Sequence, residues 1–319
     1  MEKFEKKSLL ELKRMSLVEL NKYMSDKREY EYNNNIPLNY DAIETRKRIH
    51  FLVTTILKID RIIDAHEKIT IMNDLRTRKE EGQIYACTHI GGNDVHRLVE
   101  AINDSSYIFF GDPGVAYTDP VGFLLYMNGT IYVHTREKLD RKIGYERAVE
   151  LLNHGGKLII FPEGAWNIDT NLPVAKTFKG ATRMAYETGR DITPVAIEQY
   201  GNEFIVNIGE NYKVDAFNYN EVEERDKLRD KLATLKWDIW ETRDLESRDT
   251  IEIVSEHDFA QRIVDLLSDH YGYDLQGVYD TRYQDLDMME QKQVEEDLRR
   301  ISVELIEKEY QRILKRKAS

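Results

Sequence analysis

A histidine and an aspartate lie five residues apart in the segment CTHIGGNDVHRL, which spans residues 87–98. His89 follows an apolar run typical of a β-strand, and Asp94 begins a segment with helical spacing, so the Gly91 and Gly92 pair is expected to form the turn between them. Such a turn would let the carboxylate accept a hydrogen bond from one imidazole nitrogen and leave the other nitrogen free to take a proton. This is the arrangement of a general base with its orienting partner, which contributes about 10²–10⁴-fold to a reaction rate.

The same segment allows three other interpretations. Asp94 could merely cap the helix that follows it, with His89 a polar residue of the loop. His89, Asp94 and His96 could bind a metal ion, although the sequence offers no HExxH motif or second cluster of histidine and acidic residues to support it. Cys87 could act as a nucleophile beside His89, but the pair has no third orienting partner, and a buried inert thiol fits the strand better.

A second polar landmark follows another predicted strand. The run KLIIF at 157–161 reads as a strand that continues into Pro-Glu-Gly, which places Glu163 and Gly164 at its carboxyl end. Ligands bind at this end of the strands in α/β sheets, so Glu163 would supply a fixed acceptor and Gly164 would let a substrate approach the backbone. An ordinary turn would have the same composition, because proline and glycine punctuate loops in general.

Alternating strand and helix patterns place both landmarks in one layer of structure. The predicted strands cover residues 84–88, 107–111, 130–135, 157–161, 192–198 and 203–209. Helical patterns lie between them near residues 94–103, 119–127, 140–154 and 179–188. Short strands alternating with helices predict an α/β fold, with a mostly parallel twisted sheet flanked by helices.

The two ends of the chain are predicted to be helical additions to this layer. We divide the chain into a helical N-terminal region at 1–78, an α/β core at 79–215 and a charged helical C-terminal region at 216–319. Capping-box patterns that begin at Ser8 and Ser16 predict the starts of two N-terminal helices. Apolar residues with helical spacing across 294–313 predict an amphipathic helix in the C-terminal region.

Composition and charge exclude several classes of protein. The 319 residues carry a formal net charge of −12, which argues against nucleic-acid binding through phosphate attraction. The single cysteine excludes an intrachain disulfide framework, disfavours a cysteine-based zinc site and suits a reducing cytoplasm. The longest apolar run near the N-terminus, FLVTTIL, is far shorter than the roughly 20 residues of a membrane span, so neither a spanning helix nor a signal peptide is expected.

Four landmarks resemble, in their order, the motifs of the glycerolipid acyltransferase family, which contains the bacterial 1-acylglycerol-3-phosphate acyltransferases. The segments are HIGGND (89–94), PVG (120–122) with GTIYVHTR (129–136), FPEG (161–164), and FKG (178–180) with PVAI (194–197). The first has the H-x4-D form that opens the family's pattern, and FPEG is similar to its third motif. The resemblance covers approximately residues 80–200 and says little about either end of the chain.

The resemblance implies an acyl transfer that forms no acyl-enzyme. His89, oriented by Asp94, would deprotonate an acceptor hydroxyl. The hydroxyl oxygen would then attack the thioester of an acyl-CoA or of an acylated acyl carrier protein. No metal ion and no organic cofactor is implied beyond this thioester donor.

The resemblance also implies the residues of the acceptor site. Arg136 and Lys179 would hold an acceptor phosphate, for which arginine is suited by its bidentate fork. Glu163 and Gly164 would shape the site around it. The implied partners are the acyl donor, an acyl carrier protein where that protein is the donor, and a lyso-lipid, of which 1-acylglycerol-3-phosphate is the preferred choice. The implied location is the cytoplasm, with peripheral contact at the inner face of the membrane.

The chain departs from the family's pattern in three places. Thr88 stands where the family usually has asparagine, and Ala165 with Trp166 follows FPEG where the family usually has Thr-Arg. Arg136 lies one residue later than usual. Because two of these changes concern acceptor recognition, a different lyso-lipid and a non-phosphorylated or soluble acceptor are alternatives. A non-catalytic scaffold and a metal-dependent hydrolase are the alternatives outside this chemistry.

Overall fold

The computed structural model describes most of the chain up to the end of its last assigned helix. The described residues are 4–38, 40–111, 120–134, 137–167, 172–200 and 202–242. The predicted amphipathic helix at 294–313 lies outside these ranges, as does most of the predicted C-terminal region.

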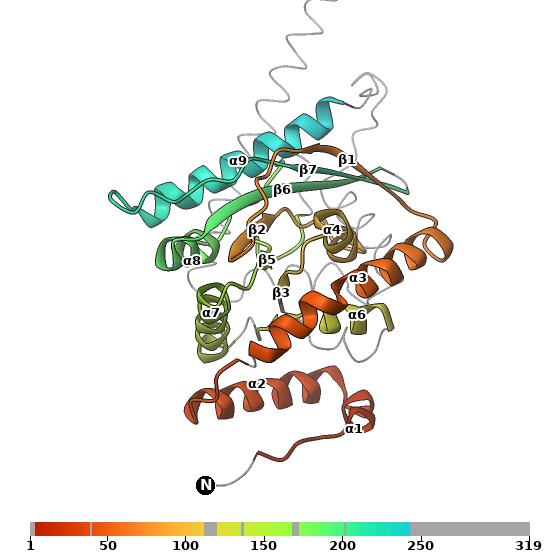
Figure 1. The fold of residues 1–319 in the computed structure, drawn as a ribbon, viewed down its shortest axis with the longest axis vertical. Coiled ribbons are helices and arrows are strands. Elements are labelled where there is room, and N and C mark those ends of the chain that lie inside the picture. Colours follow the sequence, from red (N-terminus) through yellow and green to blue (C-terminus); the bar gives the residue numbers. More distant parts are fainter. Residues whose placement is uncertain are drawn as a thin grey trace, which may run out of the picture.

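A seven-stranded sheet forms the centre of the molecule, in the order β1-β7-β6-β2-β5-β3-β4 (Figure 1). Its strands are β1 (Lys68–Asp74), β2 (Gln83–Cys87), β3 (Tyr107–Phe110), β4 (Thr130–Tyr132), β5 (Leu158–Ile160), β6 (Asp191–Tyr200) and β7 (Glu203–Ile208). Neighbouring strands run parallel except for β6 and β7, which run antiparallel. The predicted mostly parallel sheet is therefore confirmed.

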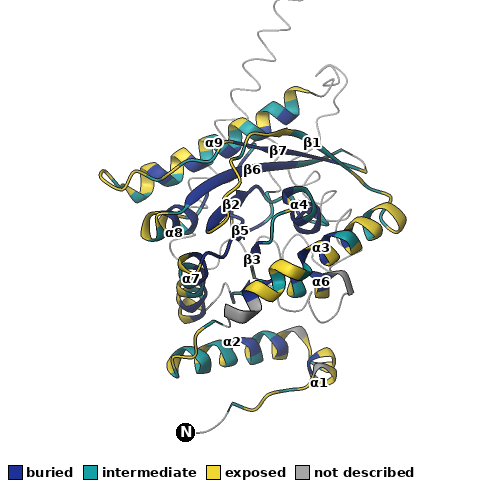
Figure 2. Ribbon diagram, viewed as in Figure 1, coloured by how far each residue is buried: buried dark blue, intermediate teal, exposed yellow. Residues whose placement is uncertain are grey.

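Helices cover both faces of the sheet, which leaves its central strands buried (Figure 2). The helices within the described ranges are α1 (Leu9–Arg14), α2 (Leu17–Asn33), α3 (Tyr40–Ile63), α4 (Asp94–Ile102), α6 (Pro120–Asn128), α7 (Lys138–Asn153), α8 (Gly180–Thr188) and α9 (Glu221–Glu241). In this part of the chain, no helix combines the length and the apolar character that crossing a membrane requires. The flanking helices confirm the predicted fold class.

Strand β2 shows why the central strands read as continuous apolar runs. All of its residues are buried, because helices pack against both of its faces. Ile84 and Ala86 belong to the core cluster that includes residues of α7, α8 and α9. Tyr85 and Cys87 point to the opposite face and belong to the cluster with α4 and α6. Side chains therefore pack against both faces of β2 as far as Cys87, two residues before His89.

The two N-terminal capping boxes are present as predicted. Ser8 and Glu11 exchange side-chain and backbone hydrogen bonds at the start of α1, and Ser16 and Glu19 do the same at the start of α2. Met15 packs against the small apolar cluster of these two helices. The cluster lies within α1 and α2 and is separate from the two clusters of the sheet.

Strand β1 corrects the prediction that residues 1–78 are helical throughout. Helix α3 ends at Ile63, and residues 68–74 form an edge strand that pairs in parallel with β7. The segment KITIMND alternates polar residues with Ile69 and Ile71, which is a strand pattern. Its partner strand lies more than 130 residues later in the chain, so the pairing that makes it a strand is not a local property of the sequence. The domain boundaries themselves stay a prediction.

Candidate active site

His89 and Glu163 meet at the carboxyl edge of the sheet. Strands β2 and β5 are parallel neighbours in which Ala86 pairs with Ile160. His89 and Glu163 each follow their strand's member of this pair by three residues, so both side chains leave the sheet at the same level. The backbone N–H of His89 donates to Oε1 of Glu163 over 3.1 Å. The structure thus brings together the two landmarks that the sequence placed 74 residues apart.

The predicted hydrogen bond between His89 and Asp94 is present. Nδ1 of His89 lies 2.8 Å from Oδ2 of Asp94, which is fully buried. The same oxygen accepts the backbone N–H groups of Ile90 and Gly91, over 2.7 and 2.9 Å. Because a carboxylate only accepts, the Nδ1 atom must carry the proton, and the other ring nitrogen of the neutral imidazole is left as a proton acceptor.

The turn between the two residues needs glycine. Gly91 and Gly92 have φ angles of +93° and +61°, in the region that other residues adopt only with strain. The N-cap of α4 is Asn93, and Asp94 is the first residue of the helix. Its carboxylate is directed back to the turn that carries His89. The simpler interpretation, in which Asp94 only caps the helix, is therefore wrong.

Two aromatic rings hold the imidazole of His89. The ring of Phe161 stacks on it at a centroid distance of 4.3 Å, and Trp166 meets it edge-on at 6.3 Å. The side chain of His89 is 13% exposed. Trp166 is one of the departures from the family's pattern, and its ring lies beside the candidate base. The sequence placed Phe161 at the end of a predicted strand, but it did not reveal that this ring contacts His89.

Glu163 ties together backbone segments at this edge of the sheet. Its Oε1 atom accepts from His89, and its Oε2 atom accepts the N–H of Ala175 over 2.8 Å. The side chain is buried. Both carboxylate oxygens are thus used to fix the chain around the histidine, and Ala175 is a partner that the sequence did not reveal.

Gly164 allows a close approach of an aromatic side chain. Its φ angle is +69°, and a Cβ atom added there would lie 2.5 Å from the ring of Phe178. The backbone N–H of Phe178 donates to the carbonyl oxygen of Pro162 over 2.7 Å, which keeps the two segments together. In the structure it is therefore the ring of Phe178, from the FKG segment, that occupies the space which glycine leaves.

Of the two residues expected to bind a phosphate, the structure describes Lys179 alone. Lys179 is the N-cap residue of α8, and its amino group forms an exposed ion pair with Glu221 at 3.2 Å. Such exposed pairs contribute little to stability, so Lys179 could leave Glu221 to bind an anion with little loss of stability. Arg136 lies outside the described residues. The assignment of both residues to an acceptor phosphate stays a prediction.

Thr88 has a clear structural role in place of the asparagine usual in the family. Its buried hydroxyl oxygen accepts the backbone N–H of Ile197 over 3.0 Å, which joins the end of β2 to β6. The carbonyl oxygen of Ile197 in turn accepts from the buried amino group of Lys236 on α9 over 2.5 Å. The residue before His89 is therefore anchored to two further elements.

Cys87 and the metal interpretation find no support in the described part of the chain. Burial raises the pKa of the Cys87 thiol well above its ordinary value, with the nearby Asp94 charge as the smaller cause, so the thiol stays neutral and unreactive. His96 is buried on α4. Among the residues that the structure describes, no group of three histidine, cysteine or acidic side chains could hold a metal ion.

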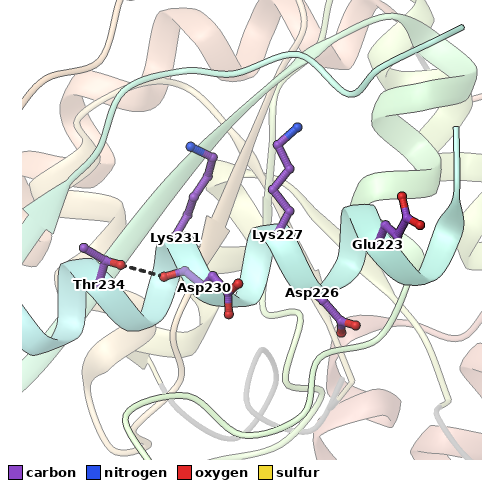
Figure 3. Close-up of a pocket in the computed structure, with 6 residues that line it drawn as sticks. All are labelled: Glu223, Asp226, Lys227, Asp230, Lys231 and Thr234. Atoms are coloured by element: carbon purple, nitrogen blue, oxygen red, sulfur yellow. Dashed lines mark hydrogen bonds between the residues drawn. The ribbon is translucent and has the colours of Figure 1, made fainter. Parts of the chain in front are cut away.

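A shallow pocket on α9 has different chemistry (Figure 3). It is lined by Glu223, Asp226, Lys227, Asp230, Lys231 and Thr234, all from this one helix. Lys227 and Lys231 lie over the ring of Tyr212, at 5.7 and 5.0 Å from its centroid. None of the residues singled out by the sequence lines this pocket, and its mixed charges are typical of a solvated helix face.

Comparisons with known proteins point to one family. Residues 68–198 match the family model described as Acyltransferase. The chain is 30% identical over 133 residues to the 1-acyl-sn-glycerol-3-phosphate acyltransferase of Borreliella burgdorferi, in a match that covers 36% of this chain and 52% of the relative. It is 26% identical over 133 residues to a chloroplastic 1-acyl-sn-glycerol-3-phosphate acyltransferase of Brassica napus, covering 40% of this chain and 38% of that protein. The chain thus spans about half the length of the first relative and less of the second.

The fold is similar to that of a solved structure. The crystal structure of the 1-acyl-sn-glycerophosphate (LPA) acyltransferase PlsC from Thermotoga maritima superposes with a TM-score of 0.50 and 15% sequence identity. The match covers 68% of this chain and 88% of that one. At this identity the likeness concerns the fold alone, and it agrees with a helix-flanked, mostly parallel sheet.

Proposed function

We propose, from the premise that residues 68–198 form a domain of the Acyltransferase family, that this chain is an O-acyltransferase. It would move a fatty acyl group from a thioester donor to a hydroxyl of a lyso-lipid, with 1-acylglycerol-3-phosphate as the acceptor. The observation that carries the proposal is the 2.8 Å hydrogen bond between His89 and Asp94 at the carboxyl edge of the sheet. The names of the relatives support the choice of acceptor.

The proposed reaction needs only a base whose protonated form is stabilised. Nε2 of His89 would take the proton of the acceptor hydroxyl as its oxygen attacks the thioester carbonyl carbon. The C–S bond would then break, and the leaving thiolate would receive the proton from Nε2, so that the imidazole is neutral again. The buried carboxylate of Asp94 would hold Nδ1 and stabilise the imidazolium between these steps. Acyl-CoA and acylated carrier protein both fit this scheme as donors.

Peripheral contact with a lipid surface at the cytoplasmic face is part of the proposal. Helix α3 exposes a set of large apolar side chains. Figure 2 colours several parts of this helix as exposed. These side chains are Phe51 (79% exposed), Leu52 (51%), Ile59 (51%), Ile62 (50%) and Ile63 (61%). An exposed apolar face of this kind on a helix supports a location at a membrane surface.

Arg136 is the proposed partner of the acceptor phosphate.

The test is a measurement of thiol release with defined donors and acceptors. Palmitoyl-CoA and palmitoyl-acyl carrier protein would each be combined with 1-acylglycerol-3-phosphate, with other lysophospholipids and with monoacylglycerol. The wild type would be compared with His89→Gln and with His154→Gln, which changes a histidine at the far end of α7. We expect acceptor-dependent release that falls by about 10²–10⁴-fold in His89→Gln alone.

Each result decides part of the proposal. Release that depends on monoacylglycerol and not on the phosphorylated acceptor would replace the proposed substrate but keep the chemistry. Release that survives His89→Gln, with the fold intact by thermal unfolding, would remove His89 from the role of base. No release with any donor and acceptor would overturn the proposed activity in favour of a scaffold.

A further inference from the structure

The face of the Phe161 ring lies over the imidazole of His89. The two ring centroids are 4.3 Å apart and the ring planes are inclined by 27°, which is a stacked arrangement. Trp166 meets the same imidazole at 89° and so does not stack on it. Phe161 is 8% exposed and the side chain of His89 is 13% exposed, so the stacked contact is largely shielded from water.

The alternation of side chains along two neighbouring strands brings these rings together. Phe161 directly follows β5, two residues after Ile159, and both belong to the core cluster on the α4 face of the sheet. His89 lies two residues after Cys87, which belongs to the same cluster. Residues two apart along a strand share a face, and β2 and β5 are parallel neighbours. Phe161 and His89 therefore leave the sheet on the same face and at adjacent strands.

An aromatic face favours the charged form of an imidazole over the neutral form. The face of a phenyl ring is electrostatically negative, and it attracts a cation within about 6 Å of its centroid, more strongly where water is excluded. In the proposed reaction the imidazole is neutral before and after acyl transfer, and it is positive only while Nε2 holds the acceptor proton. An attraction that is strongest in this form lowers the barrier without tightening the binding of the substrates.

Asp94 acts on the same charge from a different direction. Its carboxylate is bonded to Nδ1 at the edge of the imidazole over 2.8 Å, whereas Phe161 lies over a face of the ring. Neither contact uses Nε2, the nitrogen to which the proposed reaction assigns the proton transfer. The two contacts can therefore stabilise the imidazolium together.

We propose that Phe161 acts through His89, with the face of its ring stabilising the imidazolium that forms when Nε2 takes the proton of the acceptor hydroxyl. The inference rests on the proposed function. Phe161 makes and breaks no bond, because the proton passes from the hydroxyl to Nε2 and then to the leaving thiolate. Phe161 is also a core residue, and packing alone would require only an apolar ring of its size. The inference requires, in addition, electron density on the face of that ring.

The experiment changes this electron density while it nearly preserves the size of the ring. Phenylalanine analogues with one, two and three ring fluorines would replace Phe161 in the full chain by nonsense suppression, and Phe204 in parallel. Phe204 is the matched control, because it is fully buried in the same core cluster and lies on β7, two strands away from β2. Single-turnover transfer from palmitoyl-CoA to 1-acylglycerol-3-phosphate would give the rate of the chemical step. Steady-state kinetics would give KM for both substrates, and thermal unfolding would report the fold.

We expect the single-turnover rate to fall with each fluorine added at Phe161, by about tenfold in total. The same series at Phe204 should change the rate by less than about twofold. KM for both substrates should stay within about twofold, because the interaction concerns the protonated base and not the bound substrates. Phe161→Leu, which removes the aromatic face, should lose at least as much rate as the trifluorinated ring.

Several outcomes would overturn the inference. They are a constant rate across the Phe161 series, equal losses in the Phe161 and Phe204 series, or a rise in KM at an unchanged rate. If Phe161→Leu does not fold, the fluorinated chains decide, because their rings have nearly the native volume. An inactive wild type would overturn the proposed function and the role of Phe161 with it, whereas an active wild type with an insensitive fluorine series overturns the inference alone.

Discussion

The carboxylate of Glu163 holds the backbone of His89, whose N–H donates to Oε1 over 3.1 Å. The other oxygen of the same carboxylate accepts from Ala175 over 2.8 Å. The loop after β2, the loop after β5 and the segment before α8 are thereby joined at one buried side chain. Glu163 thus holds the backbone of the candidate base, and Asp94 holds its ring.

Glu163→Gln is expected to weaken both the fold and the activity. Two N–H donors point at the carboxylate, and an amide has one oxygen, so one donor would face an NH₂ group. A buried donor without an acceptor costs about 1–3 kcal/mol, which urea denaturation would measure as a lower free energy of unfolding. Glu210→Gln, at an exposed position, is the control. Equal stability of the two variants would show that the Glu163 bonds contribute nothing.

Asp94→Asn is expected to lower kcat far more than it lowers stability. An asparagine oxygen at the position of Oδ2 could still accept from His89, Ile90 and Gly91. The negative charge would be gone, so the imidazolium formed during proton transfer would lose its stabilisation, and kcat should fall by up to about 10⁴-fold. Thermal unfolding and kinetics on the same sample separate the two effects. A kcat near that of the wild type would show that the charge of Asp94 does not stabilise the imidazolium.

Gly164→Ala is expected to destabilise the protein more than Gly189→Ala does. The two glycines have nearly equal φ angles of +69° and +66°, so alanine meets the same backbone strain at both. At Gly189 no other atom lies within 4 Å of the added Cβ, whereas at Gly164 the Phe178 ring lies 2.5 Å away. The difference should be about 1–3 kcal/mol, the usual cost of overpacking, and Phe178→Leu should remove much of it. Equal losses at the two sites would contradict the close contact.

The sequence predicted those parts of the site that depend on neighbouring residues. His89 and Asp94 belong to one turn, so their hydrogen bond follows from the strand signal before the Gly91–Gly92 pair and the helix signal after it. The six strands of the predicted core were recognisable for the same reason, since each is a short apolar run between polar turns.

The remaining features depend on contacts between distant segments. Strand β1 exists through its pairing with β7, and the hydrogen bond that the N–H of Ala175 donates to Glu163 depends on how the loop before α8 returns to the sheet. Phe178 contacts Gly164, and Arg28 pairs with Asp140, from separate segments of the chain. No local sequence pattern predicts either contact. Such contacts follow only from the assembled fold.

Cys87→Ala is expected to reduce the loss of stability at alkaline pH. Burial raises the pKa of this thiol in the folded chain, whereas the unfolded thiol ionises near pH 8.5. The neutral Cys87 thiol therefore contributes fully to the free energy of unfolding below about pH 8.5. This contribution is lost as pH rises toward the folded-state pKa, by up to about 1.4 kcal/mol per pH unit. The free energy of unfolding, measured by urea denaturation from pH 7 to pH 10, should fall more steeply for the wild type than for Cys87→Ala. Parallel curves would mean that the thiol ionises as readily in the folded chain as in the unfolded one, and they would contradict its burial next to Asp94.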